Sequence, residues 1–407
     1  MKGNFNSSSS TASAAQSVAL LDLSRQYNVL KDEMLIALKH VCDSGQFVLG
    51  PTVVELEHNI ASYCQVDHAV GCASGSDALL LALMVNEIGK GDEVIVPSFT
   101  FFATVSAVTR LGATPVFADI DPVTFNIEPN EVRRLVTSRT KAIMPVHLFG
   151  QMADMIALND IAHSAPSPIL VVEDAAQSIG AELDGRRAGS WGDMTALSFY
   201  PTKNLGGAGD GGMVVTRDAE LAKKLRLYRG HGMEPRYYHS VVGINSRLDA
   251  FQAAILNVKM QYLENWSQQR DRNAQRYSEL FSEHGLADYI VLPQTKPNRR
   301  HVWNQYTIRV LPELRTTMRQ YLSEKKIGSE IYYPLGVHEQ KCYTNLGYDP
   351  QSLPETYRAS REVVALPIYP ELTEQEQVTV VQGIKTFFDE NVARKLYPSG
   401  LPSREAA

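Results

Sequence analysis

The sequence has little of what marks extracellular, metal-binding or nucleic-acid-binding proteins. Only four of its 407 residues are cysteine, and they form neither a CxxC pair nor a spacing typical of metal ligands. We therefore expect reduced thiols in a reducing compartment and no metal site. Acidic residues outnumber basic ones by 45 to 39, so no basic excess exists to neutralise a nucleic-acid backbone. The cysteines are Cys42, Cys64, Cys72 and Cys342.

Long apolar runs are also missing. No stretch approaches the roughly 18 apolar residues of a membrane helix, and the first residues lack the apolar run of a signal peptide. We therefore expect a cytoplasmic protein without a membrane contact. Residues 1–18 are rich in Ser and Ala and residues 396–407 carry Pro and Gly, so both ends are predicted to be disordered tails.

What is present fits a globular protein of two or three folding units, with 44% hydrophobic and 21% charged residues. Between Val70 and Thr216, short apolar runs alternate with helical patterns, including helices predicted over 77–88 and 100–110. Strands alternating with helices favour an α/β layer on a mostly parallel sheet, in which ligands bind at the carboxyl ends of the strands. The predicted strands are 93–96, 114–118, 142–146, 169–172, 196–199 and 213–216.

The second half of the chain changes character. A continuous helical, charged pattern over 248–283 predicts one long helix that joins a large domain (19–260) to a smaller α+β domain (261–395). Within the smaller domain we expect a strand over 305–310 and a helix over 373–388. Thr373-Glu-Gln-Glu376 has the form of a capping box at the start of that helix.

Three polar segments follow apolar runs. The first, Cys72-Ala-Ser-Gly-Ser-Asp-Ala78, opens a predicted helix. Its small polar residues offer backbone N–H groups at the positive end of the helix dipole, which suits a phosphate, although a plain helix cap explains the same pattern. The second, Val171-Val-Glu-Asp-Ala-Ala-Gln177, puts Asp174 where a buried strand ends; a structural helix cap is the alternative there.

The third segment, Leu197-Ser-Phe-Tyr-Pro-Thr-Lys-Asn-Leu-Gly206, presents Lys203 in a loop rich in glycine. A solvent-facing lysine is the alternative. Gly207, Gly209 and Gly212 satisfy GxGxxG but precede a strand, so the dinucleotide interpretation fails, and no Walker A motif is present. Together, a phosphate cradle, an acid at a strand end and a loop lysine are what pyridoxal phosphate chemistry needs: the lysine forms a Schiff base and the acid pairs with the pyridinium nitrogen.

The chain resembles the DegT/DnrJ/EryC1/StrS aminotransferases from about Leu21 to Asp389. The resemblance implies the aspartate-aminotransferase fold (fold type I), a pyridoxal phosphate cofactor and a keto sugar nucleotide as substrate. Retention of Lys203, where some relatives have His and act as dehydratases, supports transamination. The matching segments are Ser74–Ala78, Glu93–Thr104, Val146–Gln151, Glu173–Gln177, Ser198–Gly206 and Gly243–Asp249.

The resemblance also assigns roles. Lys203 would bind the cofactor and shuttle a proton, Asp174 would pair with the ring nitrogen, Gln177 would approach the ring's hydroxyl side, and Phe101 would stack on the ring, where a core aromatic is the alternative.

Further roles concern the phosphate and the substrate. Ser76, the N–H of Asp77 and the Ser198 hydroxyl would hold the phosphate. Asn245 would reach in from the partner subunit of a homodimer with shared active sites, and Arg247 would bind a carboxylate, which suits its bidentate geometry.

Two histidines each allow two interpretations. His338, in a loop over 330–340 that we expect to contact substrate together with 233–242, is a candidate sugar contact, with an exposed loop histidine as the alternative. For His147 we favour a hydrogen-bonded histidine at a strand end over a functional one.

The predicted activity is transfer of an amino group from an amino acid, by the resemblance L-glutamate, to a keto sugar nucleotide. The residues after Lys203, Asn-Leu-Gly, are similar to the C3-acting branch, whereas C4-acting relatives more often have His there. A UDP-linked 3-keto uronic acid is the first candidate and a dTDP-linked 3-keto-6-deoxyhexose the second. The alternatives are a pyridoxal phosphate enzyme acting on another small keto substrate and a non-catalytic regulatory or binding protein.

Overall fold

The computed structural model describes residues 17–391, and its centre is a seven-stranded sheet in the order β1-β9-β8-β5-β4-β2-β3. Every neighbouring pair that includes β9 is antiparallel and the remaining pairs are parallel, as the predicted mostly parallel sheet requires. Runs of β-branched and aliphatic residues form the strands because helices bury both faces of such a sheet. The strands are β1 (His68–Cys72), β2 (Glu93–Pro97), β3 (Thr114–Ala118), β4 (Thr140–Ile143), β5 (Leu170–Asp174), β8 (Met194–Ser198) and β9 (Gly212–Thr216).

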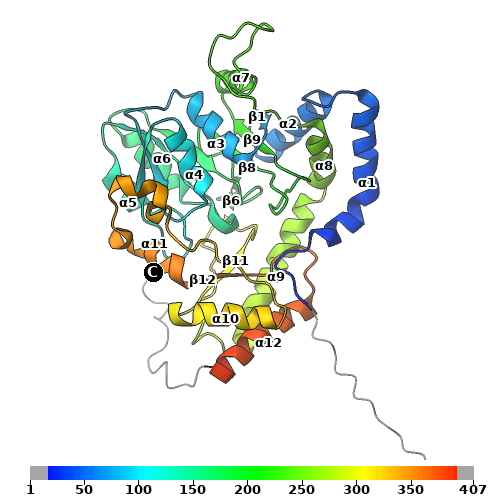
Figure 1. Cartoon of the computed structure of the whole chain (residues 1–407), viewed down its shortest axis with the longest axis vertical. Coiled ribbons are helices and arrows are strands. Elements are labelled where there is room, and N and C mark those ends of the chain that lie inside the picture. Colours follow the sequence, from blue (N-terminus) through cyan, green and yellow to red (C-terminus); the bar gives the residue numbers. More distant parts are fainter. Residues whose placement is uncertain (1–16, 392–407) are drawn as a thin grey trace, which may run out of the picture.

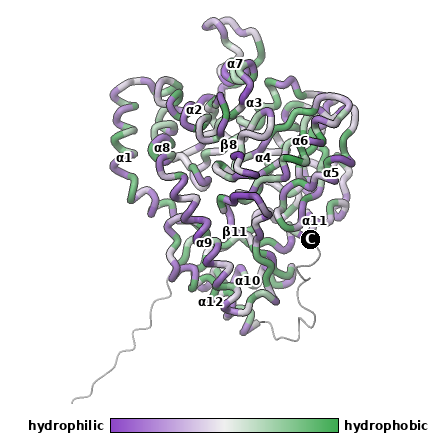
Figure 2. The backbone as a smooth tube through the Cα atoms, turned by 180° about the vertical axis from the view of Figure 1, so that it is seen from behind, coloured by the Kyte–Doolittle hydropathy of each residue, from purple (hydrophilic) through white to green (hydrophobic). Residues whose placement is uncertain are grey.

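Helices surround this sheet, and Figure 1 shows α3, α4 and α6 on one side of the molecule and α1 and α8 on the other. Figure 2 shows hydrophilic and hydrophobic stretches alternating along α1 and α9, as expected for helices with one buried face. The helices are α1 (Leu23–Ser44), α2 (Pro51–Tyr63), α3 (Gly75–Met84), α4 (Phe102–Arg110), α5 (Pro129–Leu135), α6 (Met155–Ser164), α7 (Ala219–Tyr228) and α8 (Ala250–Met260). Short strands β6 (Glu182–Leu183), β7 (Arg186–Arg187) and β10 (Arg299–Arg300) form a small three-stranded sheet.

The C-terminal elements pack around a second core, which lies below the main sheet in Figure 1. Its two-stranded antiparallel sheet pairs Tyr306 with Leu366, and α9 runs down to it from α8. The Thr373–Glu376 capping box is confirmed, since each residue's backbone N–H bonds the other's side chain. The elements are α9 (Leu263–Glu283), β11 (Tyr306–Arg309), α10 (Pro312–Glu324), α11 (Pro354–Glu362), β12 (Val363–Leu366) and α12 (Glu374–Asn391).

Three boundaries correct the sequence analysis. The predicted long helix over 248–283 is two helices, because α8 ends at Met260 and α9 begins at Leu263. The predicted helix over 77–88 spans 75–84, and the predicted strand over 142–146 spans 140–143. We retain the division at 260/261 as a proposal, and it falls at the break between α8 and α9.

The predicted N-terminal tail extends too far. Val18 is fully buried in the C-terminal core, and its backbone bonds Lys326 and Gly328, so the chain is anchored from this residue on. The remaining tail predictions fall on residues 1–16 and 396–407, outside the described residues.

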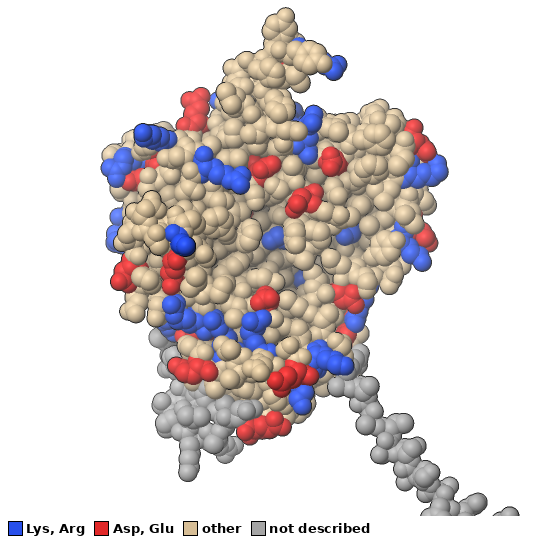
Figure 3. Space-filling view, in the orientation of Figure 1, with Lys and Arg blue, Asp and Glu red and all other residues tan. Residues whose placement is uncertain are grey.

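The surface charge is mixed, and the helices of the described residues do not suit a membrane crossing. Over the face in Figure 3, Lys and Arg are interspersed with Asp and Glu. Within residues 17–391, no helix has the length and apolar character needed to cross a membrane, and no group of three or more His, Cys, Asp or Glu is arranged to hold a metal ion.

Candidate active site

Lys203 and Asp174 come together at the carboxyl edge of the sheet. Asp174 is the last residue of β5, and Lys203 lies in the turn that follows the neighbouring strand β8. The turn is closed by the Lys203 N–H, which donates to the Tyr200 carbonyl at 2.9 Å. The carboxyl edge of a parallel sheet is where ligands bind in such folds, so the two groups occupy the expected place.

Each of these groups changes the ionisation of the other. Burial lowers the pKa of Lys203 from 10.5 to about 8, while the nearby Asp174 carboxylate opposes that change. Burial raises the pKa of Asp174, and a hydrogen bond from Thr104 is the largest of the influences that oppose it. A substantial fraction of Lys203 is therefore a neutral, nucleophilic amine at mildly alkaline pH.

The carboxylate of Asp174 is held by two donors. The Thr104 hydroxyl donates to Oδ2 at 2.7 Å, and the Ala176 N–H donates to Oδ1 at 3.2 Å. The backbone is fixed as well, because the Asp174 N–H donates to Pro145 and its carbonyl accepts from His147. Asp174 is 4% exposed, and these bonds fix the orientation of its carboxylate.

The start of α3 forms a tight turn against β8. A Cβ on Gly75 would come within 2.6 Å of the Ser198 Cβ, so only glycine allows this approach. The Asp77 N–H, predicted to hold phosphate, instead donates to the Ser74 hydroxyl at 3.1 Å as a helix cap. Ser76 is exposed, so the turn offers its side chain, the neighbouring N–H groups and the adjacent Ser198 hydroxyl to an anion.

A later segment reaches the same turn. Ser246 is fully buried, donates its hydroxyl to Asp77 at 2.7 Å and accepts from the Ala73 N–H at 3.1 Å. The residues on either side of Ser246 are more accessible to solvent, since Asn245 is exposed and Arg247 is partly exposed. The segment that the resemblance connects with a partner subunit therefore begins directly beside the phosphate turn.

Aromatic and amide groups complete the site. Gln177 donates to the Tyr333 hydroxyl at 3.3 Å and accepts from the Phe149 N–H at 2.6 Å. Phe101 is 57% exposed with its ring 6.2 Å from that of Tyr333, so the core-aromatic alternative is wrong. Phe101 immediately precedes α4, the helix whose Thr104 bonds Asp174, so its exposed ring is available to stack on a planar ligand.

His338 does not belong to this site. It is 3% exposed, its Nε2 lies 3.2 Å from the Pro350 carbonyl, and its ring packs near Phe117 and Tyr348. Both expectations for it, a sugar contact and an exposed loop histidine, are therefore corrected. The 3-10 turn that begins at Val337 draws the side chain inward, away from solvent.

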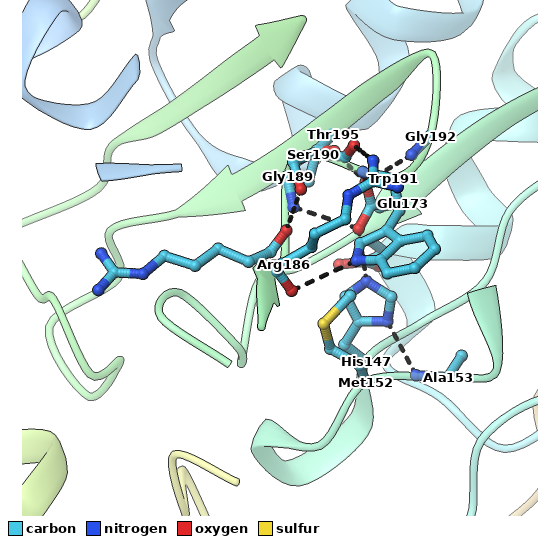
Figure 4. Close-up of polar contacts among 12 residues, drawn as sticks. His147, Met152, Ala153, Glu173, Arg186, Gly189, Ser190, Trp191, Gly192 and Thr195 are labelled. Carbon is cyan, nitrogen blue, oxygen red and sulfur yellow. Dashed lines mark hydrogen bonds and ion pairs between the residues drawn. The ribbon is translucent and has the colours of Figure 1, made fainter. Parts of the chain in front are cut away.

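Behind Asp174, on the other face of β5, lies a buried ionic cluster (Figure 4). His147 is fully buried, bonds Glu173 through Nε2 at 2.8 Å and accepts from the Ala153 N–H through Nδ1 at 3.2 Å. The hydrogen-bonded histidine expected at this strand end is thus confirmed. With both ring nitrogens engaged, the imidazole is fixed in place and has a structural role.

The loop that carries Lys203 is fixed at three further points. Asn204 donates to the Val302 carbonyl at 2.8 Å and accepts from Asn304 at 2.7 Å. From α8, the Lys259 ammonium donates to Gly206 at 2.7 Å and the Gln252 amide accepts from the Ala208 N–H at 2.8 Å. Sequence reasoning noted Asn204 but gave it no contact.

Sequence reasoning also assigned no role to Thr104, Tyr333 or Ser246. Thr104 lies in the first turn of α4, four residues after Thr100 in the segment that precedes the helix, and this spacing of two hydroxyls was the available signal. No local pattern marks Ser246, because its partner Asp77 is 169 residues away.

Comparisons with known proteins agree with this geometry. The profile of the DegT/DnrJ/EryC1/StrS aminotransferase family matches residues 28–385. A pleiotropic regulatory protein of Geobacillus stearothermophilus is 49% identical over 91% of this chain and 98% of its own. The UDP-N-acetyl-3-dehydro-alpha-D-glucosamine 3-aminotransferase of Acidithiobacillus ferrooxidans is 42% identical over 90% of this chain and 97% of its own. Streptomyces venezuelae DesV, solved in complex with a ketimine intermediate, superposes with a TM-score of 0.87 at 41% identity, covering 91% of this chain and 98% of that one.

Proposed function

Because the chain belongs to the DegT/DnrJ/EryC1/StrS aminotransferase family, we propose that it transfers an amino group from L-glutamate to C3 of a keto sugar nucleotide. Its enzyme class is transaminase and its cofactor is pyridoxal phosphate, which the family uses. The observation that carries the proposal is the electrostatic pairing of Lys203 with Asp174 at the carboxyl edge of the sheet.

The residues present fit the cofactor. The glycine at position 75 lets the α3 turn approach Ser198 closely, so that the hydroxyls and N–H groups of the two segments are available together to an anion, and Phe101 offers an exposed ring for stacking. Ser76 and Ser198 would hold the phosphate, Asp174 the ring nitrogen and Gln177 the ring's hydroxyl side. The bound cofactor supplies an aldehyde that condenses with amines and a ring that delocalises the electron pair left when a proton is removed.

The protein's own groups then do the acid–base work. Lys203, with a pKa of about 8, alternates between the neutral amine that accepts a proton and the ammonium that returns it. The Asp174 carboxylate, which accepts a hydrogen bond from Thr104, would favour a positive charge on the ring nitrogen. The bond that Asn204 donates to Val302, the bond that Lys259 donates to Gly206 and the bond that Gln252 accepts from Ala208 hold the lysine loop so that the amine stays in reach.

Support for C3 comes from two sources. The relative from Acidithiobacillus ferrooxidans is named as a 3-aminotransferase, and the Asn-Leu-Gly that follows Lys203 is similar to the C3-acting branch. Arg247, partly exposed, has no carboxylate partner within the described residues and suits a sugar carboxylate. A UDP-linked 3-keto uronic acid is therefore the first substrate to try and a dTDP-linked 3-keto-6-deoxyhexose the second.

A second candidate function is favoured by one observation. The 49% identical relative is named as a pleiotropic regulatory protein, which fits a binding role in place of turnover. Turnover of another small keto substrate is the remaining alternative. The four cysteines are free, which supports the further proposal that the protein works in the cytoplasm.

The deciding experiment incubates the purified protein, pyridoxal phosphate and glutamate with matched 3-keto and 4-keto sugar nucleotides. Mass spectrometry follows glutamate consumption and NMR locates the new nitrogen. We expect nitrogen at C3. Nitrogen at C4 with the 3-keto compounds untouched would refute the C3 proposal, whereas a cofactor-loaded protein that converts no member of the panel would favour the regulatory candidate.

We further propose a homodimer with shared active sites. Asn245 is exposed beside the phosphate turn, and α1 exposes Val29 and Ile36, which are seven residues apart on one face of the helix and suit contact with a second copy of the chain. The test mixes Lys203→Ala subunits with Asn245→Ala/Arg247→Ala subunits. One intact site in each hybrid dimer should restore about a quarter of wild-type activity after random exchange. No recovery after verified exchange would refute the shared site.

A further inference from the structure

Two threonines on α4 and its N-terminal approach point at Asp174. Thr104 is fully buried and donates its hydroxyl to Asp174 Oδ2 at 2.7 Å, and the Thr100 hydroxyl lies 3.0 Å from that of Thr104. A hydroxyl has one proton, and an ionised carboxylate only accepts. The Thr104 hydroxyl therefore donates its proton to Asp174, and in the contact between the two threonines the Thr100 hydroxyl donates to Thr104. The two hydroxyls form a directed relay that ends on the carboxylate.

We propose that Thr104 is a positioning residue of the transaminase, which fixes the plane of the Asp174 carboxylate and keeps it ionised. The proposal rests on the function proposed for this site, in which Asp174 pairs with the ring nitrogen. The hydrogen bond is short, buried and made to a charged group, which is the kind that contributes most. The other donor to this carboxylate, the Ala176 N–H, is longer at 3.2 Å and reaches the opposite oxygen.

The surroundings of Asp174 show why this donor is needed. Burial favours the neutral carboxyl, and Thr104 is the strongest of the groups that favour ionisation, ahead of the Ala176 N–H, Lys203 and His147. Lys203 faces Asp174 from the loop after β8, and His147 lies beside it across the backbone bond. Tyr333, from the segment after β11 and α10, faces the carboxylate without donating to it in the structure. Lys203 alternates its charge during turnover, so Thr104 is the constant contributor.

The test uses Thr104→Val, which keeps the shape of the side chain and removes the donor. Thr104→Ser restores the hydroxyl. Ser106→Ala is the matched control, since it also removes a hydroxyl from α4, but one that bonds the Ala103 carbonyl of the same helix. Circular dichroism and thermal unfolding of all three variants establish that the fold is intact.

The main readout is the pH at which the visible band of the bound cofactor changes. A ring nitrogen that loses its proton repels the imine proton less, so the midpoint rises. The Asp174→Asn variant, which lacks the carboxylate altogether, gives the largest rise in the midpoint and serves as the reference. We expect Thr104→Val to move the midpoint upward by part of it and to lower kcat about ten-fold with little change in the KM for the sugar. Thr104→Ser should resemble the wild type, and Ser106→Ala should change neither quantity.

The outcomes separate the two proposals. A shift in Asp174→Asn with none in Thr104→Val would overturn the role of Thr104 alone. An unchanged midpoint in Asp174→Asn would overturn the pairing of Asp174 with the ring, and with it this inference. A loss in Thr104→Val that Thr104→Ser does not restore would assign the effect to packing and reject the proposal.

Discussion

The buried carboxylate of Glu173 makes the sharpest stability prediction. Its side chain is on the face of β5 opposite that of Asp174, because successive side chains of a strand alternate. Within the described contacts it accepts five hydrogen bonds and is fully buried. Oε1 accepts from the N–H groups of Trp191 (3.0 Å) and Gly192 (2.7 Å) and from the Thr195 hydroxyl (2.9 Å), and Oε2 accepts from His147 Nε2 (2.8 Å) and the Gly189 N–H (3.2 Å).

Glu173→Gln replaces one of these oxygens with an NH₂ group, which then faces donors. The less costly orientation puts the NH₂ where Oε2 was, against His147 and the Gly189 N–H. His147 cannot simply change tautomer, because its Nδ1 accepts from the Ala153 N–H. Two bonds to a charged group are lost and two buried donors are left without a partner, which costs about 3–5 kcal/mol. That is a large part of the roughly 5–15 kcal/mol that stabilises a typical fold.

The assay is urea unfolding at neutral pH, followed by circular dichroism, with equal excess cofactor for every variant. Glu182→Gln is the control, since Glu182 pairs with Arg187 and Arg300 at 3.5 and 3.4 Å in a partly exposed position and should cost less than about 1 kcal/mol. A loss below about 1 kcal/mol in Glu173→Gln would refute the argument, because the His147 and Gly189 donors would then be satisfied without the carboxylate.

The same carboxylate predicts a pH dependence. Burial favours protonation of Glu173, but the bonds from His147 and from the N–H groups of Gly192 and Gly189 outweigh it and hold its pKa below the ordinary value of 4.5. A group whose pKa is lower in the folded state stabilises the fold fully above its unfolded pKa and loses that contribution as the pH falls. The difference in stability between wild type and Glu173→Gln should thus be constant from neutral pH down to about pH 5 and shrink below 4.5. A difference that grows on acidification would contradict the assignment.

Three predictions concern the chemistry. Lys203→Ala should abolish turnover and leave the fold intact, because the lysine supplies chemistry and little packing; residual transaminase activity, or borohydride-reduced cofactor on another lysine, would show that the assignment is wrong. Asp174→Asn should bind the cofactor but lose most activity, since a neutral amide does not stabilise a protonated ring nitrogen, and near-normal rates would contradict that role. Capture of pyridoxal phosphate by the apoenzyme requires the neutral amine of Lys203, so its rate should rise with pH around a midpoint near 8; a midpoint near 10.5 would mean that burial does not lower this pKa.

The sequence predicted the elements whose residues are buried on both faces. The strands expected at 93–96 and 213–216 were found at 93–97 and 212–216, both buried throughout, since a run rich in β-branched and aliphatic residues has few other places to lie. The break between α8 and α9 was not predictable from local pattern, because neither Gly nor Pro marks it. There Tyr262 stacks on Trp266 and bonds Glu33, which is far away in the sequence.

The candidate site likewise contains residues that a local sequence pattern predicts and residues that it does not. Lys203 and Asp174 each carry a local sequence signal, and the structure brings them together at one edge of the sheet. The groups that set their properties do not carry one. Thr104 is 70 residues from Asp174, and His338 turns inward to packing partners that no local pattern reveals. Such contacts depend on the whole fold, which a window of sequence does not contain.

Asn204 has a consequence for anyone who transplants specificity between branches of this family. The residue after the lysine is the one that our C3 proposal uses, and here its amide bonds Val302 and Asn304. The Trp303 carbonyl between them accepts from the buried Arg270 of α9. Exchanging Asn204 for His would remove the acceptor of Asn304 along with the donor to Val302. Positions 204 and 304 should therefore be changed together, because a designer who changes one alone loosens the loop that carries Lys203.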